Sequence, residues 1–85
     1  MFHYTYVLLS TKDKKFYVGF TKNLKKRFED HCAGRVSSTK ERRPLELVYY
    51  EASAHKSDAQ KREQYLKTYH GRAYIRNRLK TYLTG

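Results

Sequence analysis

The first half of the chain carries short runs of aromatic and β-branched residues separated by polar residues. Residues 4–9, Tyr-Thr-Tyr-Val-Leu-Leu, predict a strand. A polar turn at residues 12–15 precedes residues 16–20, Phe-Tyr-Val-Gly-Phe, which predict a second strand and therefore an antiparallel hairpin. Residues 45–50, which follow Pro44, predict a third strand.

Helical spacing replaces this pattern after the hairpin. Residues 23–33 predict a helix, because Leu24 and Phe28 are four positions apart and lie on one face. Asn23 is a suitable N-cap, and Gly34 is the natural end of the helix.

The second half of the chain predicts two further helices. Ser57 and Gln60 have the spacing of a capping box, which opens a helix to about Tyr69. We expect Gly71 to break this helix and a last helix to run to about Leu83. The predicted fold is a single α+β domain over residues 1–85, with a small three-stranded antiparallel sheet flanked by helices in the order β-β-α-β-α-α.

Charge is the clearest global signal. Lys and Arg number 19 against 8 Asp and Glu, a formal net charge of +11. Such a chain attracts polyanions by counterion release, which favours nucleic acid as the partner. A ribosome-associated protein or a module for a membrane surface would have a similar balance.

Several classes of protein are excluded. The single cysteine, Cys32, allows no internal disulfide framework and no thiolate zinc cluster. No apolar run is long enough to span a membrane, and the first residues lack the features of a secretion signal, so we expect a cytoplasmic protein.

Among the few carboxylates of the chain, Glu63 is the one best placed to take part in catalysis or metal binding. It shares a helical stripe with Ala59 and Leu66, at spacings of four and three, so it points toward the protein body. A carboxylate in that position must be paired, hydrogen-bonded or bound to a cation. A salt bridge to a lysine is the simpler interpretation of this residue taken alone.

Arg27 and His31 are neighbours on one face of the first predicted helix, since they are four positions apart. Arg27 can grip a phosphate with two hydrogen bonds, although it also belongs to a basic run that water could solvate. Tyr6 and Tyr17 lie on the predicted strands, where most tyrosines only pack. A nearby cation would favour the phenolate of either tyrosine and so make it a better base.

The order of these residues resembles the GIY-YIG nuclease family. Residues 4–6, Tyr-Thr-Tyr, and residues 17–19, Tyr-Val-Gly, are similar to the two short strand motifs of that family. The second motif continues through a threonine and a leucine to Arg27 and His31, as in the family pattern. Residues 57–67 resemble the family's helix that carries the metal-binding glutamate. The resemblance covers nearly the whole chain and is strongest to small stand-alone bacterial members related to the excision-repair incision subunit.

The resemblance implies roles for the two strand motifs. Tyr6 is similar to the tyrosine that ends the first motif, and Tyr17 to the tyrosine that opens the second. Either of them would activate the attacking water. Gly19 is similar to the motif glycine that lets the backbone pack close to the site.

The resemblance also implies roles for the helices. Arg27 would stabilise the transition-state phosphate, His31 would assist with the phosphate or with proton transfer, and Glu63 would bind a divalent cation. The expected ion is Mg²⁺, with Mn²⁺ as a substitute, since Mg²⁺ binds one or two carboxylates and keeps several waters. We expect Glu63 and Arg27 to meet beside the tyrosines in one pocket open to solvent.

The implied activity is endonucleolytic hydrolysis of DNA phosphodiester bonds, and branched or damaged DNA in repair or recombination would be the expected substrate. A homodimer or a partner protein would supply the specificity that an appended DNA-binding domain supplies in the family. The basic residues expected to contact DNA are Lys25, Arg35, Lys40, Arg42, Arg43 and Lys67.

Some positions depart from the family pattern. The first motif has Tyr4 and Thr5 in place of glycine and isoleucine, and Phe20 stands where many catalytic members have lysine. Asn77 is the nearest match to a downstream asparagine of the family. These departures leave two alternatives open, namely a non-catalytic nucleic-acid-binding module and a protein-interaction adaptor, each of which keeps the fold.

Overall fold

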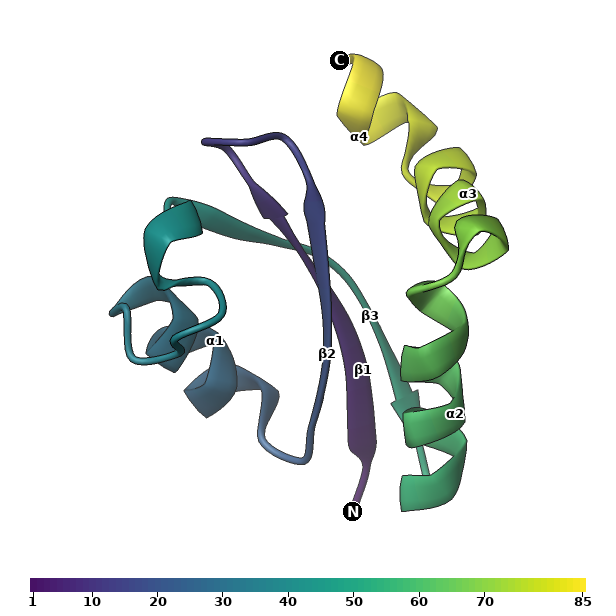
Figure 1. The fold of residues 1–85 in the computed structure, drawn as a ribbon. Helices are drawn as coiled ribbons and strands as arrows, with labels where there is room; N and C mark the ends of the chain where they lie inside the picture. The colour runs from purple at the N-terminus through teal and green to yellow at the C-terminus, as the bar shows by residue number, and fades with distance from the viewer.

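A three-stranded antiparallel sheet forms the centre of the computed structural model, which describes residues 1–85 (Figure 1). Strand β1 (His3–Ser10) pairs with β2 (Phe16–Thr21) on one side and with β3 (Leu45–Ser53) on the other, in the order β2-β1-β3. The predicted sheet is confirmed, and β2 is one of its two edge strands.

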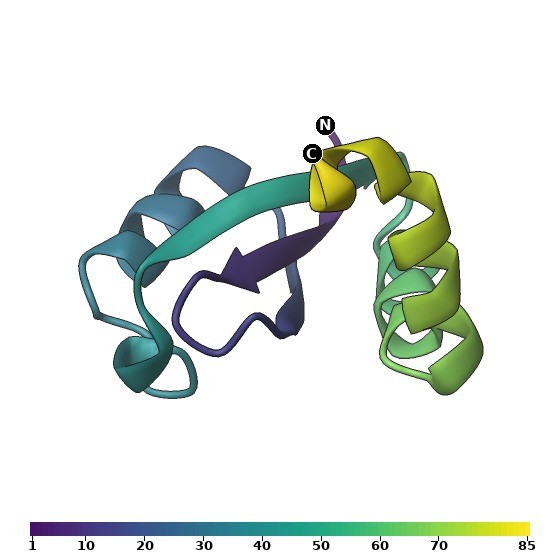
Figure 2. The same cartoon turned by 90° about the horizontal axis from the view of Figure 1, so that it is seen from above.

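Helices cover both faces of this sheet. Helix α1 (Leu24–Cys32) lies on one face, and α2 (Lys56–Leu66) and α3 (Tyr69–Arg78) lie on the other (Figures 1 and 2). A 3₁₀ helix, η1 (Lys40–Arg42), precedes β3, and a short helix, α4 (Lys80–Thr84), ends the chain.

Alternation along β1 divides the buried side chains between two cores. Tyr6 and Leu8 point toward α1, whereas Val7 points toward α2 and α3. The core on the α1 side contains Tyr6, Leu8 and Leu45, with Leu24 and Phe28 packed against it. The core on the other side contains Val7, Val18, Leu66 and Ile75.

The helix boundaries confirm some expectations and correct others. Asn23 caps α1, and Gly34 follows the helix with a φ of 78°, as predicted. The predicted capping box is wrong, because the His55 side chain caps α2 by accepting a hydrogen bond from the Ser57 amide.

The expectation that Gly71 breaks the second helix is also wrong. The break falls at Lys67–Thr68, and Gly71 lies in the first turn of α3, where its amide donates to the Thr68 hydroxyl. A side chain at Gly71 would collide with the backbone of Tyr65 and Leu66, so glycine permits the close turn from α2 to α3.

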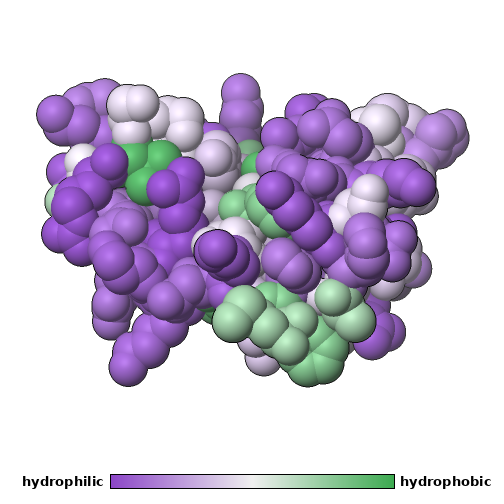
Figure 3. Space-filling model, turned by 90° about the horizontal axis from the view of Figure 1, so that it is seen from below, coloured by the Kyte–Doolittle hydropathy of each residue, from purple (hydrophilic) through white to green (hydrophobic).

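The surface is largely hydrophilic, as Figure 3 shows for the face that carries the lower ends of the strands. Hydrophobic residues, in green, gather mainly along the lower edge of this view, with smaller green areas at the upper left and near the centre. None of the four α-helices combines the length and the apolar character that crossing a membrane requires.

Candidate active site

A hydrogen-bonded cluster joins β1 to α1. The Tyr6 hydroxyl lies 2.8 Å from Nε2 of His31, and Nε of Arg27 donates to the same hydroxyl at 3.4 Å. Tyr6 and His31 are fully or almost fully buried, at 1% and 0% exposure. One helical turn separates Arg27 from His31, which lets both reach the same tyrosine.

A fourth side chain, Thr39, fixes which nitrogen of the neutral His31 ring carries the proton. Nδ1 of His31 lies 2.7 Å from the Thr39 hydroxyl, which itself donates to the Val36 carbonyl at 3.5 Å. Because the Thr39 proton is directed at a carbonyl, Nδ1–H of His31 donates to Thr39 and Nε2 is left as the acceptor. The Tyr6 hydroxyl therefore donates to His31 and accepts from Arg27.

Burial governs the electrostatics of this cluster. It lowers the pKa of His31 to about 4, with the Arg27 charge acting in the same direction, so His31 is neutral at pH 7. Burial also raises the pKa of Tyr6, and it outweighs the opposing hydrogen bond from Arg27. The expected lowering by nearby cations is present as a contribution but does not prevail at this tyrosine.

Gly19 makes room for the Tyr6 ring. It lies opposite Tyr6 in the β1–β2 register, and a Cβ atom at this position would overlap the ring and its hydroxyl. The missing side chain lets the ring lie across β2.

Tyr17 completes the aromatic part of the cluster. Its ring centroid is 5.1 Å from that of His31 and 6.4 Å from that of Tyr6. Tyr17 is half-buried, and its hydroxyl has no hydrogen-bond partner within the protein, in contrast to that of Tyr6. The more accessible of the two hydroxyls is therefore that of Tyr17.

Glu63 lies apart from the other four residues. It belongs to α2, on the opposite face of the sheet from α1 (Figure 1), and it pairs with Lys67 at 3.0 Å. Its carboxylate is near enough to Tyr6 to contribute to the raised pKa of that residue, but it forms no contact with the cluster. The expected single pocket is not formed, because Glu63 lines a hollow of about 350 Å³ with other α2 residues only.

A divalent ion would have one carboxylate ligand at Glu63. No group of three His, Cys, Asp or Glu side chains could hold a metal. The Glu63 side chain is 18% exposed, and that of Lys67 is 47% exposed and carries its charge on a flexible stem. This fits Mg²⁺, which takes its remaining ligands from water and substrate phosphate, provided that the ion displaces the lysine.

Most of the basic residues expected to contact DNA have intramolecular partners. Arg35 bonds to Asp30, Arg42 to Asp13, and Arg43 to backbone carbonyls of Lys40 and Cys32. The Lys25 and Lys40 side chains are exposed and unpaired, whereas Lys67 is paired with Glu63. Asn77 is exposed on α3 and does not approach the cluster.

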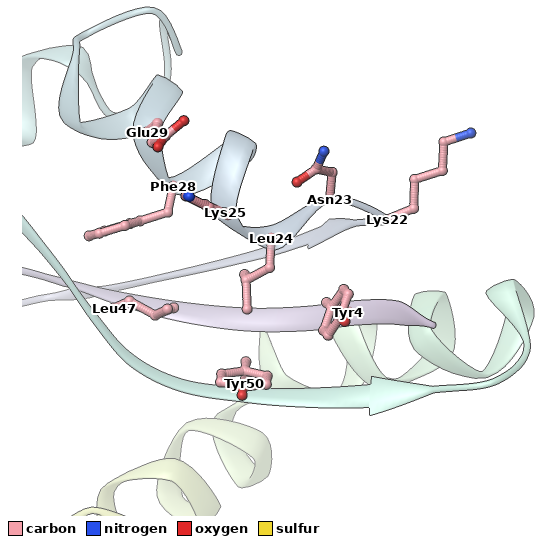
Figure 4. Close-up of a pocket in the computed structure, with 9 residues that line it drawn as sticks. All are labelled: Tyr4, Lys22, Asn23, Leu24, Lys25, Phe28, Glu29, Leu47 and Tyr50. Carbon is pink, nitrogen blue, oxygen red and sulfur yellow. The ribbon is translucent and has the colours of Figure 1, made fainter. Parts of the chain in front are cut away.

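The cavity between α1 and the sheet lies beside the cluster. It has a volume of about 680 Å³, and it is bordered by Tyr4 of β1 and Tyr50 of β3 (Figure 4). None of the five expected site residues lines it.

Sequence reasoning missed Thr39. This residue is completely buried, although it lies in a basic loop without periodicity. The only signal for it in the sequence is the presence of serine and threonine in that loop, which does not distinguish Thr39 from Ser37 or Ser38.

Comparison with known proteins identifies the class. A model of the family described as GIY-YIG catalytic domain matches residues 2–78. The solution NMR structure of the UPF0213 protein from Bacillus halodurans has a TM-score of 0.55 and 29% identity, over 88% of this chain and 82% of that one. The fold prediction is therefore confirmed by a solved relative.

Curated relatives narrow the class. The chain is 43% identical over 68 residues to a UPF0213 protein of Staphylococcus haemolyticus, covering 79% of this chain and 82% of the relative. It is 42% identical over 66 residues to a UPF0213 protein of Clostridium perfringens, covering 76% of this chain and 70% of the relative. The chain thus belongs to the GIY-YIG family and, within it, to the UPF0213 proteins.

Proposed function

We propose that this protein is a divalent-metal-dependent endonuclease that hydrolyses DNA phosphodiester bonds. The observation that carries the proposal is the cluster of Tyr6, Arg27 and His31, joined by hydrogen bonds in which both ends of the neutral imidazole are used. Membership of a family described as a catalytic domain supports it. The expected relation to the excision-repair incision subunit stays a prediction.

Arg27 is the residue best placed for the phosphate. Only its Nε is used within the protein, so its two terminal nitrogens are available to a phosphate oxygen. The hydrogen bond to Tyr6 raises the pKa of Arg27, which keeps the guanidinium charged. A fixed guanidinium stabilises the charge that develops on the phosphate in the transition state.

Tyr17 is the tyrosine that we assign to the attacking water, because its hydroxyl is free and accessible. Tyr17 would act as the phenolate, after giving its own proton to solvent. As the water oxygen forms its bond to phosphorus, the phenolate oxygen takes the water proton, the bond from phosphorus to the 3′ oxygen breaks, and the leaving 3′ oxygen takes a proton from solvent water. Tyr6, buried between Arg27 and His31, holds those two side chains in position.

Glu63 is the residue that would hold Mg²⁺ or Mn²⁺, after Lys67 moves away. When bound, the ion polarises the phosphate and stabilises the leaving oxygen. Hydrolysis of this kind gives ends with a 3′-hydroxyl and a 5′-phosphate.

A non-catalytic nucleic-acid-binding module is the second candidate. Two observations favour it: the Glu63 carboxylate is paired with Lys67, and Phe20 stands where many catalytic members have lysine. This candidate predicts DNA binding that survives loss of Glu63 and no cleavage by the unmodified protein.

Cleavage of supercoiled, branched and single-stranded DNA with Mg²⁺ or Mn²⁺ separates the two candidates. We expect Glu63→Gln and Arg27→Gln to reduce cleavage by about 10² or more while DNA binding persists. Glu29→Gln is the matched control, since Glu29 is an exposed glutamate of α1 outside the cluster. Cleavage equal in the wild type and in both site variants would reject the proposed site, and no cleavage by the wild type of any substrate would favour the binding module.

A further inference from the structure

A basic notch lies between the β1–β2 turn and α3, and it includes neither the residues of the Tyr6 cluster nor Glu63. Its volume is about 460 Å³. The residues that line it are Asp13, Lys15, Phe16, Arg42, Arg72 and Arg76.

Two of the charged residues in the notch neutralise each other. Nε of Arg42 lies 2.7 Å from the Asp13 carboxylate, and this guanidinium holds the pKa of Asp13 below its usual range. A terminal nitrogen of Arg42 donates to the carbonyls of Lys15 and Phe16. Arg42 thus fixes the wall of the notch, and its charge is largely offset by Asp13.

Three cations remain without a partner. Arg72 and Arg76 are four positions apart and therefore share one face of α3, which points at the notch. Both are exposed, as is Lys15, and none of the three side chains forms an ion pair or a hydrogen bond. Like charges gathered in one concave surface repel each other, so the notch is suited to an anion.

The notch is aligned with the candidate active site along the edge of the sheet. Phe16 opens β2 at the notch, and Gly19, opposite Tyr6, lies three residues further along the strand. Three residues of a strand span about 10 Å. No strand lies outside β2, so an extended polyanion can follow this edge from one site to the other.

We propose that the notch binds a second phosphate of the DNA backbone whose scissile phosphate is held by Arg27. The inference rests on the proposed function for the identity of the anion. Phosphates follow each other at about 3.4 Å along the axis of a strand, so the bound phosphate lies within about three positions of the cut. The notch would hold DNA in register without reading its bases.

DNA binding without cleavage is the first test. The double variant Arg72→Gln, Arg76→Gln is compared with Arg78→Gln, Lys80→Gln, which removes the same charge from exposed positions outside the notch. Anisotropy of labelled DNA is measured in EDTA between 50 mM and 200 mM salt. A lost phosphate contact lowers the salt slope by about 0.9 and costs about eightfold in affinity at 0.1 M salt. We expect this loss in the notch variant and a smaller one in the control.

Replacing single DNA phosphates with uncharged analogues locates the phosphate that the notch contacts. Methylphosphonates are placed singly at the three positions on each side of the cut mapped for the wild type. We expect one of these positions to weaken binding by the wild type and to have no further effect in the notch variant. Equal loss of affinity in the notch variant and its control, or the same methylphosphonate profile in the wild type and the notch variant, would overturn the proposal.

Failure of the notch is distinguishable from failure of the nuclease. If the wild type binds DNA through the notch but cuts no substrate, the proposed phosphate site stands and the proposed nuclease activity is wrong. If the wild type cuts DNA but the notch variant binds DNA as its control does, the nuclease activity stands and the proposed phosphate site is wrong. If the wild type does not bind DNA, both proposals are wrong.

Discussion

Replacing Gly19 with alanine should destabilise the protein through a single contact with Tyr6. The new Cβ would overlap the hydroxyl and Cζ of Tyr6 and would lie 2.8 Å from Cε2 of the same ring. The ring is 1% exposed and lies against His31 and Tyr17, so it cannot swing away without breaking its hydrogen bonds.

The expected loss of stability combines three effects. Overpacking costs about 1–3 kcal/mol. Loss of the hydrogen bond between Tyr6 and His31 adds about 1 kcal/mol. The removal of glycine from a strand returns about 0.5–1 kcal/mol. The net loss is about 2 kcal/mol, which lowers the Tm of a domain of this size by about 8–16 °C.

The same substitution in a protein without Tyr6 shows whether the contact with Tyr6 causes the loss of stability. Leucine in place of Tyr6 lacks all three atoms that the new methyl group would meet, namely the hydroxyl oxygen and two ring carbons. In the Tyr6→Leu background we therefore expect Gly19→Ala to be neutral or to stabilise by about 0.5–1 kcal/mol. Urea denaturation and thermal melting of the four proteins measure this coupling. The same cost of Gly19→Ala in both backgrounds would refute the steric argument.

Three further predictions concern the hydrogen-bonded cluster. The folded protein keeps His31 neutral until about pH 4 while the unfolded chain protonates it near 6.5, so stability should fall by about 3 kcal/mol as the pH drops through this range, and denaturation of His31→Gln should show a smaller fall. Thr39→Val removes the hydrogen bond that holds the proton on Nδ1 of His31, so the ring can adopt the other tautomer; kcat should fall about tenfold with KM unchanged, whereas Thr39→Ser should restore kcat. Arg27→Lys keeps the charge but loses the planar fork, so kinetics should show a loss of about 10²-fold in kcat, close to that of Arg27→Gln.

Periodicity in the sequence was sufficient to predict the sheet and α1, because their residues follow the periods of strand and helix without interruption. It failed at Gly71, which was expected to end a helix. Glycine there meets a steric requirement of the packing between α2 and α3, and that packing is tertiary. His55 was missed as a cap for a related reason, since its ring reaches the Ser57 amide only in the geometry of the folded turn.

The site shows the same division between what is local and what is tertiary. Arg27 and His31 were placed together correctly because one helix turn relates them. The stripe of Ala59, Glu63 and Leu66 predicted that Glu63 points toward the protein body, and its side chain is 18% exposed between two fully buried neighbours. A stripe gives only the direction of burial, and an inward residue of α2 meets the face of the sheet opposite α1. In the proposed mechanism, Glu63 would act with Arg27 across the edge at β2, and the substrate would bridge the two faces. A phosphate held on one side by Arg27 and on the other by a cation at Glu63 would complete the pocket that the protein alone does not form.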